Sequence, residues 1–287
     1  MLAQLNGHSE GISSLSPSPS GGFLCSTSGD GTAQVWNLTL SESSARLTHH
    51  RDAVNNATFV DGSDVFLMTC SDDRSVCFWD LRASLEPVRV LSGFADGINK
   101  VLTTNGSVIS AADDGLVYVH DIATGNIMDK FWVATNTVND ILLDPTNTSI
   151  LLTCSEDCAV RTWRLGGPTE AATEDRLVAS FDEFENPVNH IGLCNGWIFA
   201  ACSECVFASE FSEGHFGTGA KVFSCHTDYV RGIEFLTRMN TMFTVSDDTT
   251  LVEWNLETCE PIRQCKVHDD LVMALALIET TACDTIA

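Results

Sequence analysis

The sequence predicts an all-β protein built from repeated four-stranded sheets, and three observations carry this prediction. A Ser-x-Asp triplet followed, after five residues, by an aromatic residue recurs along the chain, and the marker residues lie 41 to 48 positions apart. Short apolar runs of strand length separated by turn residues fill the intervals, and no stretch keeps a helical period. The markers and their aromatic partners are Asp30 with Trp36, Asp73 with Trp79, Asp114 with His120, Asp157 with Trp163, Cys205 with Phe211, and Asp248 with Trp254.

A second mark precedes each repeat. His8, which follows Gly7, and His50, His226 and His268 each stand four residues before an apolar residue. Phe94, Ala134 and Phe184 take the equivalent place in the other three repeats. Within one repeat, four short strands are expected near residues 53–60, 65–70, 75–81 and 87–93, because turn residues separate apolar runs there.

These marks resemble the WD-repeat family over essentially the whole chain. The resemblance implies a β-propeller of seven repeats, the last one incomplete, as a single domain over residues 1–287. In that family the His, Ser or Thr, Asp and Trp of a blade form a hydrogen-bonded chain. The motif matches complete it in three repeats, as His8–Ser28–Asp30–Trp36, His50–Ser71–Asp73–Trp79 and His226–Ser246–Asp248–Trp254.

Each of these four-residue sets contains Ser, His and Asp, but we interpret the sets as structural. A hydrolase serine needs an oxyanion hole and a nucleophile elbow, and neither motif is found near these serines. The sets also recur in three repeats, whereas an active site is normally unique. No catalytic residue, metal site or cofactor is therefore expected. Cys202 and Cys205 have CxxC spacing without a second pair, which favours a structural role.

The two ends of the chain are expected to share the closing blade. Residues 267–287 supply a first strand and most of a second, while a third strand would begin beyond residue 287. Residues 1–6 lie where the family places the outermost strand of the last blade. Either the chain is a fragment of a longer one, or the closing blade is defective. The long connection over residues 165–179 is expected to project as a loop.

Composition narrows the classes of partner. The chain has 39 acidic and 15 basic residues, for a net charge of −24, which disfavours direct binding to nucleic acid or to an anionic membrane. It favours partners with basic segments. We find no targeting segment, and the longest apolar run, residues 272–278, is too short for a membrane span. The 12 cysteines are interpreted as free thiols in the cytoplasm or nucleus.

The predicted function is a non-catalytic scaffold for protein–protein interaction. The position two residues after each histidine mark is acidic in five of seven repeats, and it should lie at the mouth of the central channel. A rim of one sign would attract a basic peptide segment, and Tyr229 would stack on a guanidinium. The alternative is that these side chains only cap their own turns. The residues are Glu10, Asp52, Asp96, Asn136, Asn186, Asp228 and Asp270.

A second interpretation rests on Trp79-Asp80-Leu81-Arg82. With the preceding strand, this segment resembles the box shared by WD-repeat substrate receptors of cullin-RING ubiquitin ligases. The resemblance implies that Arg82 would contact the ligase adaptor. A third class, a propeller enzyme, needs a unique polar cluster in the channel, and the sequence contains none that we can identify.

Overall fold

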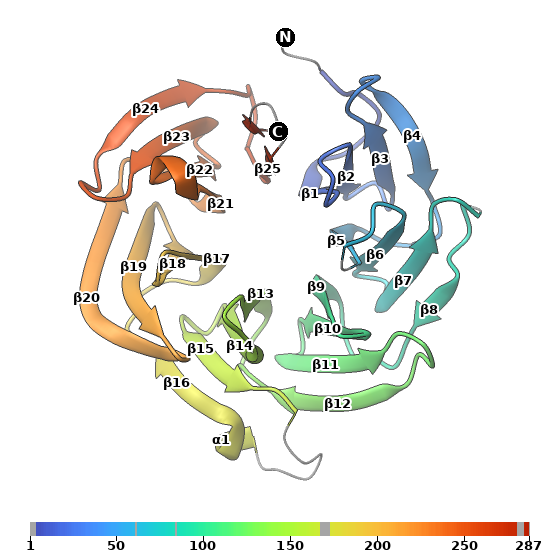
Figure 1. The fold of residues 1–287 in the computed structure, drawn as a ribbon, viewed down its shortest axis with the longest axis horizontal. Helices are drawn as coiled ribbons and strands as arrows, with labels where there is room; N and C mark the ends of the chain where they lie inside the picture. The colour runs from blue at the N-terminus through green and yellow to red at the C-terminus, as the bar shows by residue number, and fades with distance from the viewer. Residues whose placement is uncertain (1–3, 61, 84, 167–172, 280–283, 287) are drawn as a thin grey trace. The chain divides into compact units, whose positions relative to one another are not determined.

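The computed structural model describes residues 4–60, 62–83, 85–166, 173–279 and 284–286. Contacts within the chain group it into two compact units. Unit 1 comprises residues 1–130 with 276–287, and unit 2 comprises residues 131–275. Six antiparallel four-stranded sheets make up most of the described residues, and in each sheet the strands pair in chain order, as in the blades of a β-propeller (Figure 1).

Unit 1 contains the first three blades. Blade one consists of β1 (Ile12–Pro17), β2 (Phe23–Ser28), β3 (Ala33–Asn37) and β4 (Glu42–Leu47). Blade two consists of β5 (Val54–Phe59), β6 (Phe66–Ser71), β7 (Ser75–Asp80) and β8 (Arg89–Leu91). Blade three consists of β9 (Ile98–Thr104), β10 (Ser107–Ala112), β11 (Leu116–Asp121) and β12 (Ile127–Trp132), of which the last two residues fall in unit 2.

Unit 2 contains the other three blades. Blade four consists of β13 (Val138–Asp144), β14 (Asn147–Ser155), β15 (Val160–Arg164) and β16 (Leu177–Phe181). Blade five consists of β17 (Val188–Cys194), β18 (Trp197–Cys202), β19 (Cys205–Ser212) and β20 (His215–Ser224). Blade six consists of β21 (Val230–Leu236), β22 (Thr241–Ser246), β23 (Thr250–Asn255) and β24 (Pro261–Lys266), with the 3-10 turn η1 (Thr237–Met239) after β21.

The long connection predicted over residues 165–179 is only partly a loop. Residues 173–176 form the short helix α1 (Thr173–Arg176), and Leu177 already begins β16. Arg176 is buried, and its guanidinium lies 4.8 Å from the centroid of the Phe131 ring. Residues 167–172 lie outside the described residues. Among the described residues, no helix is long and apolar enough to span a membrane.

In blade two the second strand, β6, is buried on both faces, because blade one covers one face and blade three the other. In blade two, Leu67 and Trp79 pack against Val35 and Leu47 of blade one. Met68, from the opposite face of β6, packs in the core shared with blade three. Such strands read as continuous apolar runs instead of alternating ones, which is why FLMTC is fully apolar except for its threonine. The outer strand β4 is largely exposed.

The closing repeat differs from the prediction. It contains a two-stranded sheet of β25 (Leu277–Glu279) and β26 (Asp284–Ile286), so the described residues hold six complete blades and this additional hairpin. The first strand begins at Leu277, well after the predicted start, and the preceding Leu271 and Met273 are exposed and lie in no strand. Within unit 1, Ala276 and Ile278 pack against blade one.

The described part of the predicted N-terminal outer strand is residues 4–6. Residues 4–6 carry no strand, and residues 1–3 lie outside the described residues. The side chain of Leu5 packs beside Leu24, Trp36 and Ile278. An apolar contact, with no strand pairing among residues 4–6, thus holds this segment to unit 1.

Candidate functional site

Blade two shows how the polar side chains that mark a repeat are connected. Nδ1 of His50 lies 2.9 Å from Asp73 Oδ2, and Nε2 lies 2.8 Å from Thr69 Oγ1. The indole N–H of Trp79 donates to the same Thr69 oxygen at 2.9 Å. The Asp73 carboxylate can only accept, so Nδ1–H of the neutral His50 ring donates to it and Nε2 accepts the Thr69 hydroxyl hydrogen. The Thr69 oxygen in turn accepts the indole N–H of Trp79. The hydrogen-bonded series therefore runs from Trp79 through Thr69 and His50 to Asp73.

The serines that were predicted to belong to this hydrogen-bonded series lie at the neighbouring turn and take no part in it. Ser71 Oγ donates to the carbonyl oxygen of Asp52 at 3.2 Å and accepts the backbone N–H of Asp73 at 3.0 Å, so it holds the turn. Ser28 and Ser246 do the same in blades one and six. The bridging hydroxyls there belong to Ser26 and Thr244. Alternate residues of a strand share a face, so spacing alone did not distinguish position 69 from position 71.

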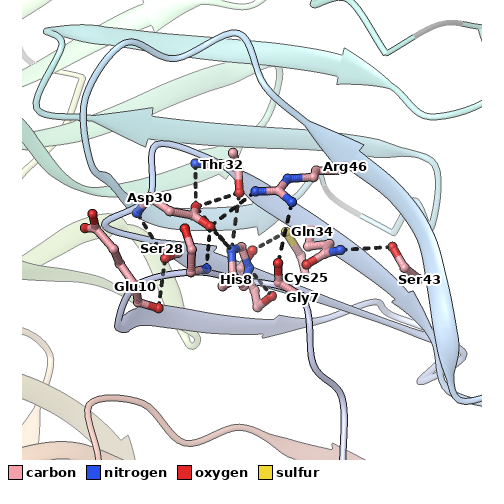
Figure 2. Close-up of polar contacts among 12 residues, drawn as sticks. Gly7, His8, Glu10, Cys25, Ser28, Asp30, Thr32, Gln34, Ser43 and Arg46 are labelled. Carbon is pink, nitrogen blue, oxygen red and sulfur yellow. Dashed lines mark hydrogen bonds and ion pairs between the residues drawn. The ribbon is translucent and has the colours of Figure 1, made fainter.

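Blade one shows how completely the marker aspartate is satisfied (Figure 2). Asp30 accepts the Thr32 hydroxyl at 2.6 Å and the Ser9 N–H at 3.0 Å, and it lies 3.2 Å from His8 Nδ1. Nη2 of Arg46 lies 3.4 Å away. Burial alone would raise the pKa of Asp30, but the hydrogen bonds from Thr32, Ser9 and His8 outweigh it and lower this pKa to about 2. A carboxylate held this way stabilises its turn.

Blade four keeps part of this network, with an arginine in place of the histidine. The Trp163 N–H donates to Thr153 Oγ1 at 3.0 Å, as in blade two. Ala134 occupies the histidine place, and the guanidinium of Arg161 takes over, donating to both oxygens of Asp157 at 2.9 and 3.0 Å. No sequence motif indicated this replacement, because Arg161 lies on the third strand and not at the histidine mark.

Blade five lacks the network, and its register corrects two predicted positions. Cys205 pairs with Cys202 as Ser75 pairs with Ser71, so it occupies the place of Ser75 and not that of the marker aspartate. Ser209 pairs with Ile198 as Trp79 pairs with Leu67, so Ser209 stands in the tryptophan place. Phe211 lies two residues further along the same strand. The turn before β19 has two residues in place of three, which shifts the markers.

The predicted partner-binding residues are exposed, and most also cap their own turns. Asp52, Asp96, Asp228 and Asp270 each accept the backbone N–H of the next residue, at 2.8 to 3.0 Å. Glu10 is exposed as well, and its carbonyl oxygen accepts the hydroxyl of Ser28. The capping interpretation is thus right for the four aspartates, and it leaves their side chains at the surface.

Two further carboxylates meet these turns in unit 1. Asp72 and Asp113 flank Gly97, where an added Cβ would lie 3.0 Å from Asp72 Oδ1 and 2.8 Å from Asp113 Oδ2. Burial raises the pKa of Asp72, and the charges of Asp113 and Asp52 add to this although Asn55 donates a hydrogen bond to Asp72. We call Asp52, Asp72, Asp96 and Asp113 the acidic cluster. The sequence signal for Asp72 and Asp113 was their place just before the marker aspartate.

Tyr229, in unit 2, already has a cationic neighbour. It is 42% exposed, and the guanidinium of Arg231 lies 5.4 Å from its ring centroid. Arg231 in turn donates to Asp247 through Nε at 2.9 Å and through Nη2. The predicted stacking of Tyr229 on a partner's guanidinium would therefore compete with the chain's own arginine.

Comparisons with known proteins show which proteins this chain resembles. A family model described as WD domain, G-beta repeat, matches residues 1–37 and 41–80. These two segments of the chain are thus WD repeats. Nuclear distribution protein PAC1 of Arthroderma otae is 23% identical over 281 residues, which cover 88% of this chain and 60% of that protein. Nuclear distribution protein nudF of Aspergillus niger is 24% identical over 288 residues, covering 87% of this chain and 60% of that protein.

A further relative matches a shorter stretch. Protein transport protein Sec31A of Homo sapiens is 26% identical over 175 residues, which cover 57% of this chain and 14% of that protein. The chain thus spans about 60% of the length of the nuclear distribution relatives and far less of the transport protein.

Arg82 is the remaining predicted site residue of this chain. Its Nε and Nη2 donate to the two carboxylate oxygens of Asp80 at 3.0 and 2.9 Å, and its Cζ lies 5.0 Å from the centroid of the Phe66 ring. The side chain is 61% exposed. Among the described residues, no group of three His, Cys, Asp or Glu side chains is placed to hold a metal ion.

Proposed function

We propose that this chain is a non-catalytic scaffold of the cytoplasm or nucleus that binds other proteins, and that a basic segment of a partner binds at the acidic cluster. The observation that carries the proposal is the convergence of Asp72 and Asp113 on Gly97, with Asp52 close enough to raise the pKa of Asp72. Like charges held together favour a cation between them. The names of the relatives describe distribution and transport proteins, which supports a role other than catalysis.

Gly97 gives the acidic cluster its recognition geometry. Because no side chain stands at this position, a lysine ammonium or an arginine guanidinium can approach Asp72 and Asp113 closely. Asn55 and Asn99 orient these carboxylates, with the Asn99 side-chain amide 2.8 Å from Asp113 Oδ1. Glu10, Asp228 and Asp270 occupy the corresponding turns of other repeats and would extend the attraction to basic partners.

Capture of partners from a cell lysate tests the proposal. Asp52→Lys combined with Asp96→Lys reverses two exposed charges of the acidic cluster and should reduce recovery of the bound proteins seen with wild type. Glu42→Lys combined with Glu257→Lys makes the same change in net charge at exposed positions outside the cluster. If both double variants capture partners as wild type does, the acidic cluster is not the binding site.

A second candidate function, substrate receptor of a cullin-RING ubiquitin ligase, is favoured by one observation. Arg82 is largely exposed, yet Asp80 and Phe66 hold its guanidinium in one orientation, as a contact residue requires. Arg82→Ala should abolish co-purification of the ligase adaptor, while the exposed control Arg263→Ala should not. Absence of the adaptor from wild-type pull-downs would exclude this function.

A further inference from the structure

An apolar cavity of about 290 Å³ lies between blades four and five of unit 2. Its walls include Val160 of blade four and Ile198 and Ala200 of blade five, together with the rings of Phe181, Phe184 and Phe207. Phe207 and Val222, which also line it, are 37% and 49% exposed, so the cavity reaches the surface. A drug-sized ligand usually takes a pocket of about 300–1,000 Å³, so this volume suits something smaller.

The cavity exists because blade five lacks the side chains that fill this place in the other repeats. Phe184 stands in the histidine place, Ala200 pairs with Ile191 as Thr69 pairs with Ala57, and Ser209 stands in the tryptophan place. All three line the cavity. In blades two, four and six, the indole of Trp79, Trp163 or Trp254 is buried at the position that Ser209 occupies here.

A hydroxyl offers the cavity its polar contact. Ser209 Oγ donates to the carbonyl oxygen of Gly217 at 3.2 Å or of Glu210 at 3.3 Å, and a hydroxyl oxygen keeps acceptor capacity when it donates. An indole N–H entering from outside would find an acceptor, as the N–H of Trp79 finds Thr69. Aromatic neighbours add favourable ring contacts, since the Phe184 and Phe207 centroids lie 5.6 Å apart at 74°.

The charge around the opening of the cavity favours particular residues next to the indole in a ligand. Glu183 lines the cavity, and Asp182 and Glu185 are exposed beside it. Among the described residues that line the cavity, the one cation is Lys221, whose ammonium donates to the Leu256 carbonyl at 2.7 Å and lies 4.6 Å from the centroid of the Trp197 ring. Three carboxylates beside this one ammonium make the opening acidic on balance, so it complements a positively charged ligand.

We propose that this cavity binds a tryptophan side chain of a partner polypeptide that carries lysine or arginine next to the tryptophan. The inference rests on the proposed function only in taking a polypeptide as the ligand. The site lies in unit 2 and shares no residue with the acidic cluster. It recognises an aromatic side chain and not charge alone.

Saturation-transfer NMR with two short capped peptides tests the proposal. Wild type should transfer saturation to the indole protons of acetyl-Lys-Trp-Lys-amide and give no comparable signal with acetyl-Lys-Ala-Lys-amide. Ser209→Trp places the chain's own indole in the cavity, so it should abolish the signal and raise the melting temperature. Ser224→Trp, at an exposed position of the same blade, should leave the signal unchanged.

Further outcomes decide the proposal if Ser209→Trp does not fold. Ala200→Leu narrows the cavity from its floor and should weaken binding at least about tenfold, equivalent to about 1.4 kcal/mol. Equal signals from both peptides, or an unchanged signal in folded Ser209→Trp or Ala200→Leu, would overturn the assignment. Asp52→Lys with Asp96→Lys should still bind the tryptophan peptide, which separates this site from the acidic cluster.

Discussion

A single buried hydroxyl connects the indole of Trp79 with the ring of His50 in blade two. Thr69 is fully buried, and its oxygen serves both the Trp79 indole and the His50 ring. A buried donor that loses its partner costs far more than a hydrogen bond gains, because water cannot replace the partner. The stability of the turn therefore depends on this threonine as much as on the marker aspartate.

Replacing Thr69 with Val should destabilise the protein by about 1–3 kcal/mol, because the shape is kept while the His50 and Trp79 contacts are lost. Urea unfolding followed by tryptophan fluorescence measures the difference. Thr58→Val, on the neighbouring strand with a half-buried hydroxyl, is the matched control and should change stability by less. Equal losses in the two variants would show that the hydroxyl of Thr69 does not connect the pair.

Acid should weaken the same networks. The pKa of Asp30 is lowered to about 2 from its ordinary 3.8, so its charged form is favoured in the folded state. The stabilisation from Asp30 is then fully present above a pH of about 4 and is lost as the pH falls towards 2. The free energy of unfolding of wild type should exceed that of Asp30→Asn at pH 6, and the gap should close in acid. A gap that stays constant with pH would contradict the lowered pKa.

At the scale of the element, strands and turns could be predicted better than registers. The motif spacing placed the second and third strands of the blades, since apolar runs between turns leave few alternatives. The predicted register of blade five was wrong, because its turn at residues 203–204 is one residue shorter than the turn at 72–74 in blade two. The shorter turn puts Ser209, and not Phe211, at the tryptophan position. A change of one residue in a turn leaves no trace in hydrophobicity.

The closing hairpin offers a test at this scale. Ile278 is 3% exposed and packs with Leu24 and Trp36 of blade one. Ile278→Ala should cost about 2–5 kcal/mol, because it opens a cavity in this core. Ile262→Ala, at a residue that is 56% exposed, should change stability by no more than about 0.5 kcal/mol. Similar melting temperatures for both variants would mean that the hairpin does not contribute to unit 1.

At the scale of the whole molecule, the net charge and the repeats of the sequence predicted the class of partner and the fold, but they did not predict the individual sites. A charge of −24 predicts basic partners, and the position after each histidine mark predicts where acidic side chains reach the surface. The convergence of Asp72 and Asp113 on Gly97 joins separate repeats, and the cavity at Ser209 arises from missing side chains. Neither feature has a local sequence pattern, because both depend on how neighbouring blades pack.

The central claim is that the acidic cluster, and not the overall charge, binds a basic segment. Fluorescence anisotropy with a labelled octalysine peptide tests it most directly when salt is raised from about 50 mM to about 500 mM, which shortens electrostatic screening lengths severalfold. Wild type should bind with an affinity that falls with salt. Asp52→Lys with Asp96→Lys should bind much more weakly than Glu42→Lys with Glu257→Lys, although the net charges are equal. Equal binding by these two variants, or binding that does not change with salt, would contradict the claim.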